Sequence, residues 1–73
     1  MKEDKKIGIF GNNLKSIRLF LNISQSELSE RSGLTTAAIS QIESGKREPS
    51  LRSICSILKA LNIKFERMMG AVK

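Results

Sequence analysis

The feature that most constrains this chain is a glycine, Gly33, that separates two short segments, each with its own helix-start signal. In the first segment, Ser24 and Glu27 form the S-x-x-E pattern of a capping box. In the second, Thr35 is a good N-cap only two residues after the glycine. Glycine adopts the left-handed conformation that ends many helices without a steric penalty. The pattern therefore predicts two short helices that cross on a tight turn.

The apolar residues of this region predict how the two helices pack. Ile23 and Leu28 occupy the positions of a hydrophobic staple around the first cap, and Leu34 and Ile39 repeat that arrangement around the second. At about 100° per residue, Ile39 and Ile42 fall on the inward side of the second helix, which is predicted to run to residue 44. The outward side and the first turn then carry small and polar residues, namely Thr36, Ala37, Ser40, Gln41 and Ser44.

Three further helices are predicted around this pair, which makes the chain all-α with five helices. The first covers 12–21, with an apolar stripe of Leu14, Ile17 and Leu21 and a cap at Asn12 or Asn13. The fourth follows Pro49 and a cap at Ser50, ends at Asn62, and has a stripe of Leu51, Ile54, Leu58 and Leu61 with Cys55 and Ile57 beside it. Cys55 is interpreted as a small buried hydrophobe. A short fifth helix is predicted over 64–69.

The ends of the chain are predicted to lie outside the folded domain. Residues 1–6 alternate charges without an apolar pattern, so residues 1–10 are predicted to form a flexible arm, with Ile9 and Phe10 covering the core. Residues 71–73 are predicted to be a C-terminal tail, which leaves one domain over 11–70. A basic arm can also reach into a DNA groove, but Glu3 and Asp4 favour a solvated tail.

Composition limits the class of function. The 73 residues contain 13 Lys and Arg against 7 Asp and Glu, a net charge of +6, which favours polyanionic partners: nucleic acid first, an anionic membrane second. One cysteine and no histidine exclude an intramolecular disulfide, a Cys/His zinc site and histidine-based catalysis. We therefore expect no metal, no cofactor and no enzymatic activity. Cysteine usage and the lack of a ~20-residue apolar run favour a cytoplasmic location.

Two charged residues are predicted to pair inside the protein. At about 100° per residue, Arg18 lies about 40° from Leu14 at the edge of the first helix's buried stripe, and Glu43 lies about 40° from Ile39 on the third helix. A bidentate pair between them would join these helices and orient the third. The alternative is that Arg18 reaches a phosphate. The next basic residues, Lys46 and Arg47, form the densest positive pair beside the third helix.

The C-terminal helix carries more apolar surface than so short a helix needs for itself. Phe65, Met68 and Met69 lie close together in the sequence. Some of this surface can close the core, and the surplus is a candidate dimer interface.

The chain resembles the XRE family of helix-turn-helix regulators, also called Cro and lambda-repressor-like, over most of its length. The matching patterns are L-x-x-I-R at Leu14 to Arg18, S-Q-x-x-L at Ser24 to Leu28, S-G-L at Ser32 to Leu34, I-S-Q-I-E-S-G-K-R-E-P-S at Ile39 to Ser50, and A-L-N-I at Ala60 to Ile63. The resemblance implies a compact five-helix domain that binds a pseudo-palindromic DNA operator as a homodimer, with the third helix in the major groove, usually to repress and sometimes to activate transcription.

The resemblance also implies roles for individual residues. Base edges would be contacted by Thr36, Ala37, Ser40 and Gln41, and phosphates by Gln25, Thr35, Ser44, Lys46 and Arg47. It implies the Arg18 and Glu43 pair as well. Two departures from the family pattern matter: short residues at Thr36 and Ala37 leave Gln41 as the candidate for a bidentate amide contact to adenine, while Ala37 can contact a thymine methyl. Lys64 replaces the usual capping residue of the fifth helix, so that helix is predicted to be short.

Two other roles remain open for this fold. In antitoxins the main partner is a protein, and the apolar tail Phe65 to Val72 would then contact a toxin while DNA binding serves autoregulation. The short chain also suits a restriction-modification controller or a small prophage repressor. Neighbouring genes for a methylase, a toxin or phage proteins would distinguish these roles.

Overall fold

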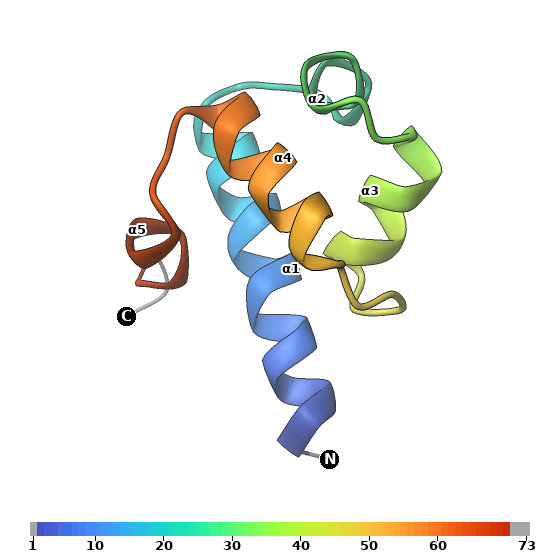
Figure 1. Ribbon diagram of the computed structural model, residues 1–73, viewed down its shortest axis with the longest axis vertical. Coiled ribbons are helices and arrows are strands. Elements are labelled where there is room, and N and C mark those ends of the chain that lie inside the picture. The colour runs from blue at the N-terminus through green and yellow to red at the C-terminus, as the bar shows by residue number, and fades with distance from the viewer. Residues whose placement is uncertain (1, 71–73) are drawn as a thin grey trace.

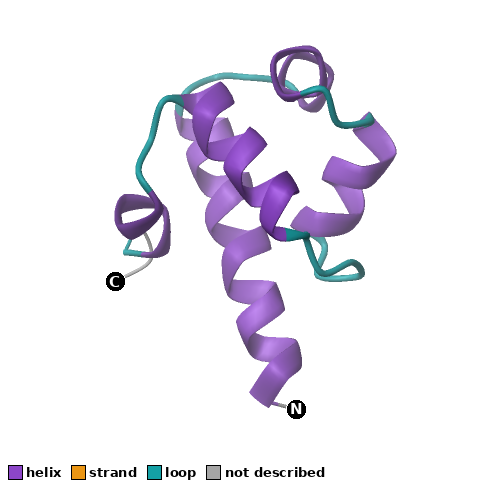
Figure 2. Cartoon of the chain, viewed as in Figure 1, coloured by secondary structure: helices purple, strands orange, loops and turns teal. Residues whose placement is uncertain are grey.

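A computed structural model describes residues 2–70 of the chain, which form five helices and no strand (Figures 1 and 2). The helices are α1 (Lys2–Phe20), α2 (Gln25–Ser32), α3 (Thr36–Glu43), α4 (Leu51–Leu61) and α5 (Phe65–Met69). This is the all-α, five-helix architecture predicted from the sequence. Within the described range, each helix is too short or too polar to cross a membrane.

All five helices contribute to one hydrophobic core. α3 and α5 both pack against α1, and they lie on its opposite sides in Figure 1. α2 packs against α3 and α4. The buried apolar side chains are Phe10, Leu14, Ile23, Leu28, Ile39, Ile42, Ile57, Leu61 and Met68.

The local signals in the sequence place both ends of α2 and α4 and the start of α3 correctly, whereas α3 ends at Glu43, one residue before its predicted end. The hydroxyl oxygen of Ser24 accepts from the Glu27 amide at 3.0 Å, and that of Thr35 accepts from the Ala38 amide at 3.0 Å. Ser50 caps α4 in the same way. α2 ends at Gly33, whose φ is +79°, and α4 ends at Asn62 with φ +56°. The crossing of α2 and α3 is therefore fixed by the residues that predicted it.

The prediction for the first helix was wrong about its start. α1 begins at Lys2, so residues 2–10, assigned to an arm, form its first half, and Asn13 is buried within the helix instead of capping it. The glycine at Gly11 does not end the helix, because a glycine in a helix interior costs only about 1 kcal/mol relative to alanine and tertiary packing can override that cost. Phe10 is buried as predicted, whereas Ile9 is 44% exposed. Residues 71–73, the predicted tail, lie outside the described residues.

The predicted apolar stripe of α4 was centred on the wrong residue. Ile57 is completely buried, while Leu51 is 77% exposed and Cys55 is exposed rather than buried. With Ile57 at the centre and about 100° per residue, Leu51 lies about 120° away and Cys55 about 160° away, so both face outwards. The actual stripe is Ile54, Ile57, Leu58 and Leu61.

Candidate nucleic-acid interface

The outer side of α3 presents the four predicted base-reading residues together. On the inner side, Ile39 and Ile42 are at most 1% exposed, which fixes the rotation of α3 about its own axis. The exposed part of the helix surface carries small and polar side chains that leave the helix free to approach a flat surface or a groove. These exposed residues are Thr36, Ala37, Ser40 and Gln41.

A buried ion pair holds α3 against α1 from the inside. Arg18 Nε donates to Glu43 Oε2 at 2.7 Å, and Arg18 Nη2 donates to Glu43 Oε1 at 3.0 Å, the bidentate geometry predicted from the helical angles. Arg18 Nη1 also donates to the Ile23 carbonyl at 2.8 Å. Hydrogen bonding to Glu43 raises the pKa of the Arg18 guanidinium and outweighs burial, which lowers it. The pair therefore orients α3 through charges that have no access to DNA.

Two predicted phosphate contacts already have their side chains engaged within the protein. Gln25 Nε2 donates to Glu43 Oε1 at 3.0 Å, which adds α2 to the ion pair. The Gln25 side-chain NH₂ group carries two N–H donors, so one is used on Glu43 and the other can still donate to a phosphate. The Thr35 oxygen accepts from the Ala38 amide, but its hydroxyl proton can still donate outwards. Local sequence gave no sign of the Gln25 contact, which joins residues 18 positions apart.

A glycine that the sequence patterns did not single out sets the distance between α1 and α3. A Cβ atom at Gly11 would collide with the backbone carbonyl oxygen of Ile42 and would lie 3.2 Å from the Cα of Glu43. The two helix backbones are therefore in direct contact at this point. A larger residue would push α3 outwards, because a backbone cannot rotate away as a flexible side chain can.

The loop after α3 folds back onto Gln41. Gly45, with φ +80°, turns the chain, and the amides of Lys46 and Arg47 both donate to the Gln41 carbonyl, at 2.9 Å and 3.2 Å. The Ser44 hydroxyl donates to the same carbonyl at 3.1 Å. The three predicted phosphate contacts of this loop are thus exposed and lie beside the outer side of α3.

The predicted dimer interface is only partly available. Met68 is completely buried in the hydrophobic core, so its assignment to a dimer interface was wrong, because a side chain without exposed surface cannot contact a second subunit. Asn13 Nδ2 donates to the Met68 carbonyl at 2.7 Å. Phe65 is 51% exposed and Met69 is partly buried. The tail proposed to contact a toxin extends to Val72, outside the described residues.

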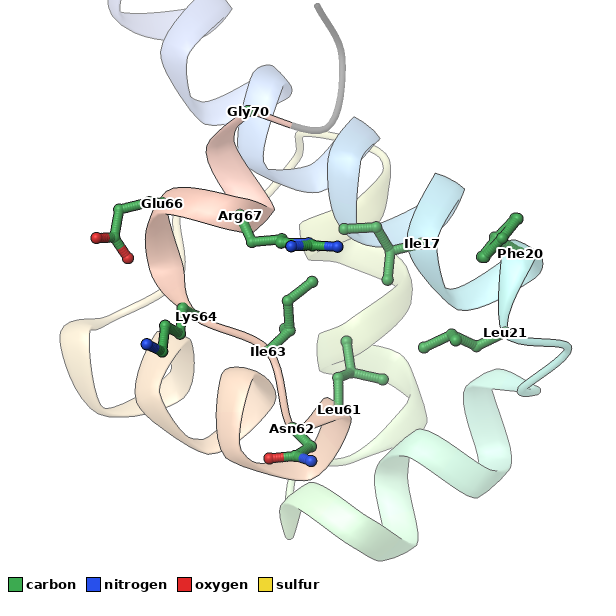
Figure 3. A pocket seen from close by; sticks show the side chains of 10 residues that line it. All are labelled: Ile17, Phe20, Leu21, Leu61, Asn62, Ile63, Lys64, Glu66, Arg67 and Gly70. Atoms are coloured by element: carbon green, nitrogen blue, oxygen red, sulfur yellow. The ribbon is translucent and has the colours of Figure 1, made fainter.

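A second apolar surface lies beside α5. It is an open groove of about 950 Å³ between the end of α1 and the α4–α5 connection (Figure 3). Phe20, at its edge, is 87% exposed, and Leu21, predicted to be buried, is 44% exposed because it lines this open groove. Ile17 and Arg67 also line it. α5 and α3 lie on opposite sides of α1 (Figure 1), so the groove is separate from the predicted base-reading residues.

Comparison with known proteins gives a consistent result. A family profile described as helix-turn-helix matches residues 14–68. The uncharacterized HTH-type transcriptional regulator y4dL of Sinorhizobium fredii is 41% identical over 64 residues, covering 82% of this chain and 33% of that protein. Control protein C.SmaI of Serratia marcescens is 33% identical over 61 residues, covering 84% of this chain and 73% of that protein.

A solved structure supports the same assignment. The restriction-modification controller protein C.AhdI from Aeromonas hydrophila superimposes with a TM-score of 0.83 at 30% sequence identity, covering 88% of this chain and 97% of that one. By contrast, the chain spans only 33% to 45% of the length of several curated regulators that it matches. The profile match over 14–68, the regulator relatives and the shared five-helix fold lead to one conclusion. The chain belongs to the XRE-type helix-turn-helix family of DNA-binding transcriptional regulators.

Proposed function

We propose that this protein binds a pseudo-palindromic DNA operator as a homodimer, with α3 in the major groove, and represses transcription. The observation that carries the proposal is the exposed side of α3, which is small and polar, held from behind by the buried Arg18–Glu43 pair and bordered by Lys46 and Arg47. A rigid helix with short side chains can approach base edges closely, and the net charge of +6 favours the DNA backbone.

The two sets of contacts have different tasks in this proposal. Lys46, Arg47 and the backbone amides at the starts of α2 and α3 hold phosphates and fix the register of the protein on the duplex. Gln41 donates to and accepts from an adenine, while Ala37 contacts a thymine methyl group. Phosphate contacts supply most of the affinity, and the contacts from α3 choose the sequence.

A two-fold dimer would place two copies of α3 about 34 Å apart, so the half-sites would be separated by one turn of DNA. Phe65 remains the candidate interface residue because 51% of its surface is exposed. Sedimentation of the purified protein with and without DNA tests this. A monomer at tens of micromolar that stays a monomer on DNA would contradict the dimer.

The division of tasks predicts different effects for two variants: Gln41→Ala should lose sequence preference, and Lys46→Ala should lose overall affinity. We expect Gln41→Ala to reduce the preference for a selected operator over a scrambled duplex, because the amide contact to a base is lost. Lys46→Ala should weaken binding to both duplexes by the same factor. It should also reduce the steepness of the plot of log binding constant against log salt concentration by about one unit. Binding titrations on both duplexes at several salt concentrations measure the two effects. An equal loss on both duplexes for Gln41→Ala would contradict base reading by that residue.

A restriction-modification controller is the second candidate for the biological role. The similarity to C.SmaI and C.AhdI favours it, since this chain covers most of the length of both proteins. A methylase gene beside the gene for this protein, together with binding to the DNA upstream of that gene in a footprinting experiment, would support it. The apolar groove beside Phe20 favours instead a role as an antitoxin, with a toxin protein as the partner. A toxin gene beside the gene for this protein would support that role.

A further inference from the structure

We propose that Arg47 positions the side-chain amide of Gln41 and so determines which base this residue reads; the inference rests on the proposed DNA-binding function. Arg47 Nη1 donates to Gln41 Oε1 at 3.4 Å on the exposed surface. Arg47 was assigned from the sequence only to a phosphate. The structure brings it instead to the one long polar side chain of the base-reading set.

The backbone of the loop makes this contact a property of the fold. The Gln41 carbonyl accepts from the Ser44 hydroxyl and from the amides of Lys46 and Arg47. The tight turn that allows this depends on Gly45, whose φ is +80°. These three hydrogen bonds to one carbonyl fix the backbone of Arg47 relative to the backbone of Gln41, and so fix the positions of their two Cβ atoms. The guanidinium therefore reaches the amide from a defined direction.

The position of the guanidinium determines which of the two polar atoms of the Gln41 amide, Oε1 or Nε2, faces Arg47. A guanidinium only donates, so it stabilises the rotamer in which the Gln41 oxygen faces Arg47 and disfavours the one in which the NH₂ group does. Recognition of adenine needs this order, because the amide oxygen must accept from N6 while the amide nitrogen donates to N7. A carbonyl oxygen has two lone pairs, so Oε1 can accept from Arg47 and from adenine together.

The same guanidinium has donors left for the DNA backbone. Arginine carries five N–H donors in a rigid fork, and one of them is used on Gln41. A phosphate bound by the other donors would position the guanidinium, and through it the Gln41 amide, relative to the DNA. Lysine is a flexible point charge, and it cannot hold an amide from a fixed angle while it binds a phosphate. Arg47 thus links backbone binding to base reading.

The variants Arg47→Lys and Gln41→Ala, singly and together, test the link. Affinity is measured on the selected duplex and on one with the Gln41-dependent base pair replaced, at several salt concentrations. Arg47→Lys should keep the salt slope, because the charge remains, but lose about fivefold or more of the discrimination at that base pair. The double variant should discriminate no less than Gln41→Ala alone. Arg67→Lys, the same change at an exposed position on α5, is the matched control and should leave discrimination unchanged, and thermal unfolding verifies that each variant is folded.

The outcomes separate the two proposals. If Gln41→Ala abolishes discrimination at that base pair while Arg47→Lys retains it fully, Arg47 does not position the amide, and the proposed function stands. If the double variant loses as much discrimination free energy as the two single variants added together, the two residues act independently. The inference about Arg47 then fails, and the proposed function stands. An equal loss on both duplexes for Gln41→Ala would overturn base reading by Gln41 itself, and the role of Arg47 with it.

Discussion

Two short helices, α3 and α5, pack on opposite sides of α1 (Figure 1), and they are held there in very different ways. α3 has a side-chain cap at Thr35, a bidentate buried pair between Glu43 and Arg18, and backbone contact with α1 at Gly11. Each of these fixes a different degree of freedom: the start of the helix, its rotation and its distance. The helix proposed to read DNA is therefore placed by several independent constraints.

α5 has fewer attachments. Its N-cap residue, Lys64, makes no side-chain capping bond, and Met68 is its only completely buried side chain. The long-range hydrogen bond from Asn13 to the Met68 carbonyl uses the amide nitrogen, while the amide oxygen of Asn13 is buried and has no hydrogen-bond partner among the described residues. A buried unsatisfied oxygen offsets part of what the hydrogen bond contributes. The more firmly placed of the two helices is therefore α3, the one that we propose reads DNA.

The largest effect is expected from breaking the ion pair behind α3. Glu43→Ala leaves the Arg18 guanidinium buried without its partner and should lower the free energy of unfolding by about 3–5 kcal/mol. Urea or thermal denaturation measures the loss. Glu66→Ala, an exposed carboxylate on α5, is the matched control and should change stability by less than about 0.5 kcal/mol. A loss below about 1 kcal/mol for Glu43→Ala would show that α3 does not depend on the pair.

Met68→Ala tests the attachment of α5. Removing a fully buried methionine should cost about 2–5 kcal/mol, at the lower end if the loosely held helix collapses into the space. Hydrogen exchange should show α5 opening before α3 in this variant. Met69→Ala, at a partly buried position, should cost less. Uniform loss of protection across both helices would contradict the difference drawn between them.

Gly11→Ala tests the distance between α1 and α3. The added methyl group meets the backbone of α3 at Ile42 and Glu43, so overpacking should cost about 1–3 kcal/mol in spite of the better helix propensity of alanine. DNA affinity should fall further than stability alone accounts for, because α3 is displaced. Gly70→Ala, at the end of α5, is the control for DNA affinity and should leave it unchanged. A stabilised Gly11→Ala variant would show that the two backbones are not in contact.

The smallest effect expected is a gain. Lys64→Ser introduces the cap that α5 lacks and should stabilise the protein by about 0.5–1 kcal/mol. Lys59→Ser, an exposed lysine within α4, controls for the change in charge and should give no gain. No gain at residue 64 would mean that the end of α5 is already satisfied in another way.

The sequence predicted the features that depend on residues close together in the chain. The caps at Ser24 and Thr35 and the turn at Gly33 are local, and they appear in the structure as expected. The Arg18–Glu43 pair was also predictable, because both residues hold the same angular position beside a clear apolar stripe. The outward side of α3 followed from the same angular argument.

The failures share a physical cause, which is that packing between distant segments decided the outcome. The contact of Gly11 with α3 and the bond from Gln25 to Glu43 depend on residues far away in the chain. In α4 several apolar residues compete for one buried side, and only packing selects Ile57 over Leu51. Met68 was counted among the surplus apolar residues because α5 is short, and only the packed structure shows that the core uses it.

The most direct measurement of the central claim is an NMR titration of the protein with a selected operator duplex. We predict that the largest amide shifts occur along the outer side of α3, at the start of α2 and in the loop 44–47, while α5 and the groove at Phe20 change little. Changes concentrated at Phe20 and α5, with α3 unaffected, would contradict the account that the locked helix is the one that meets DNA.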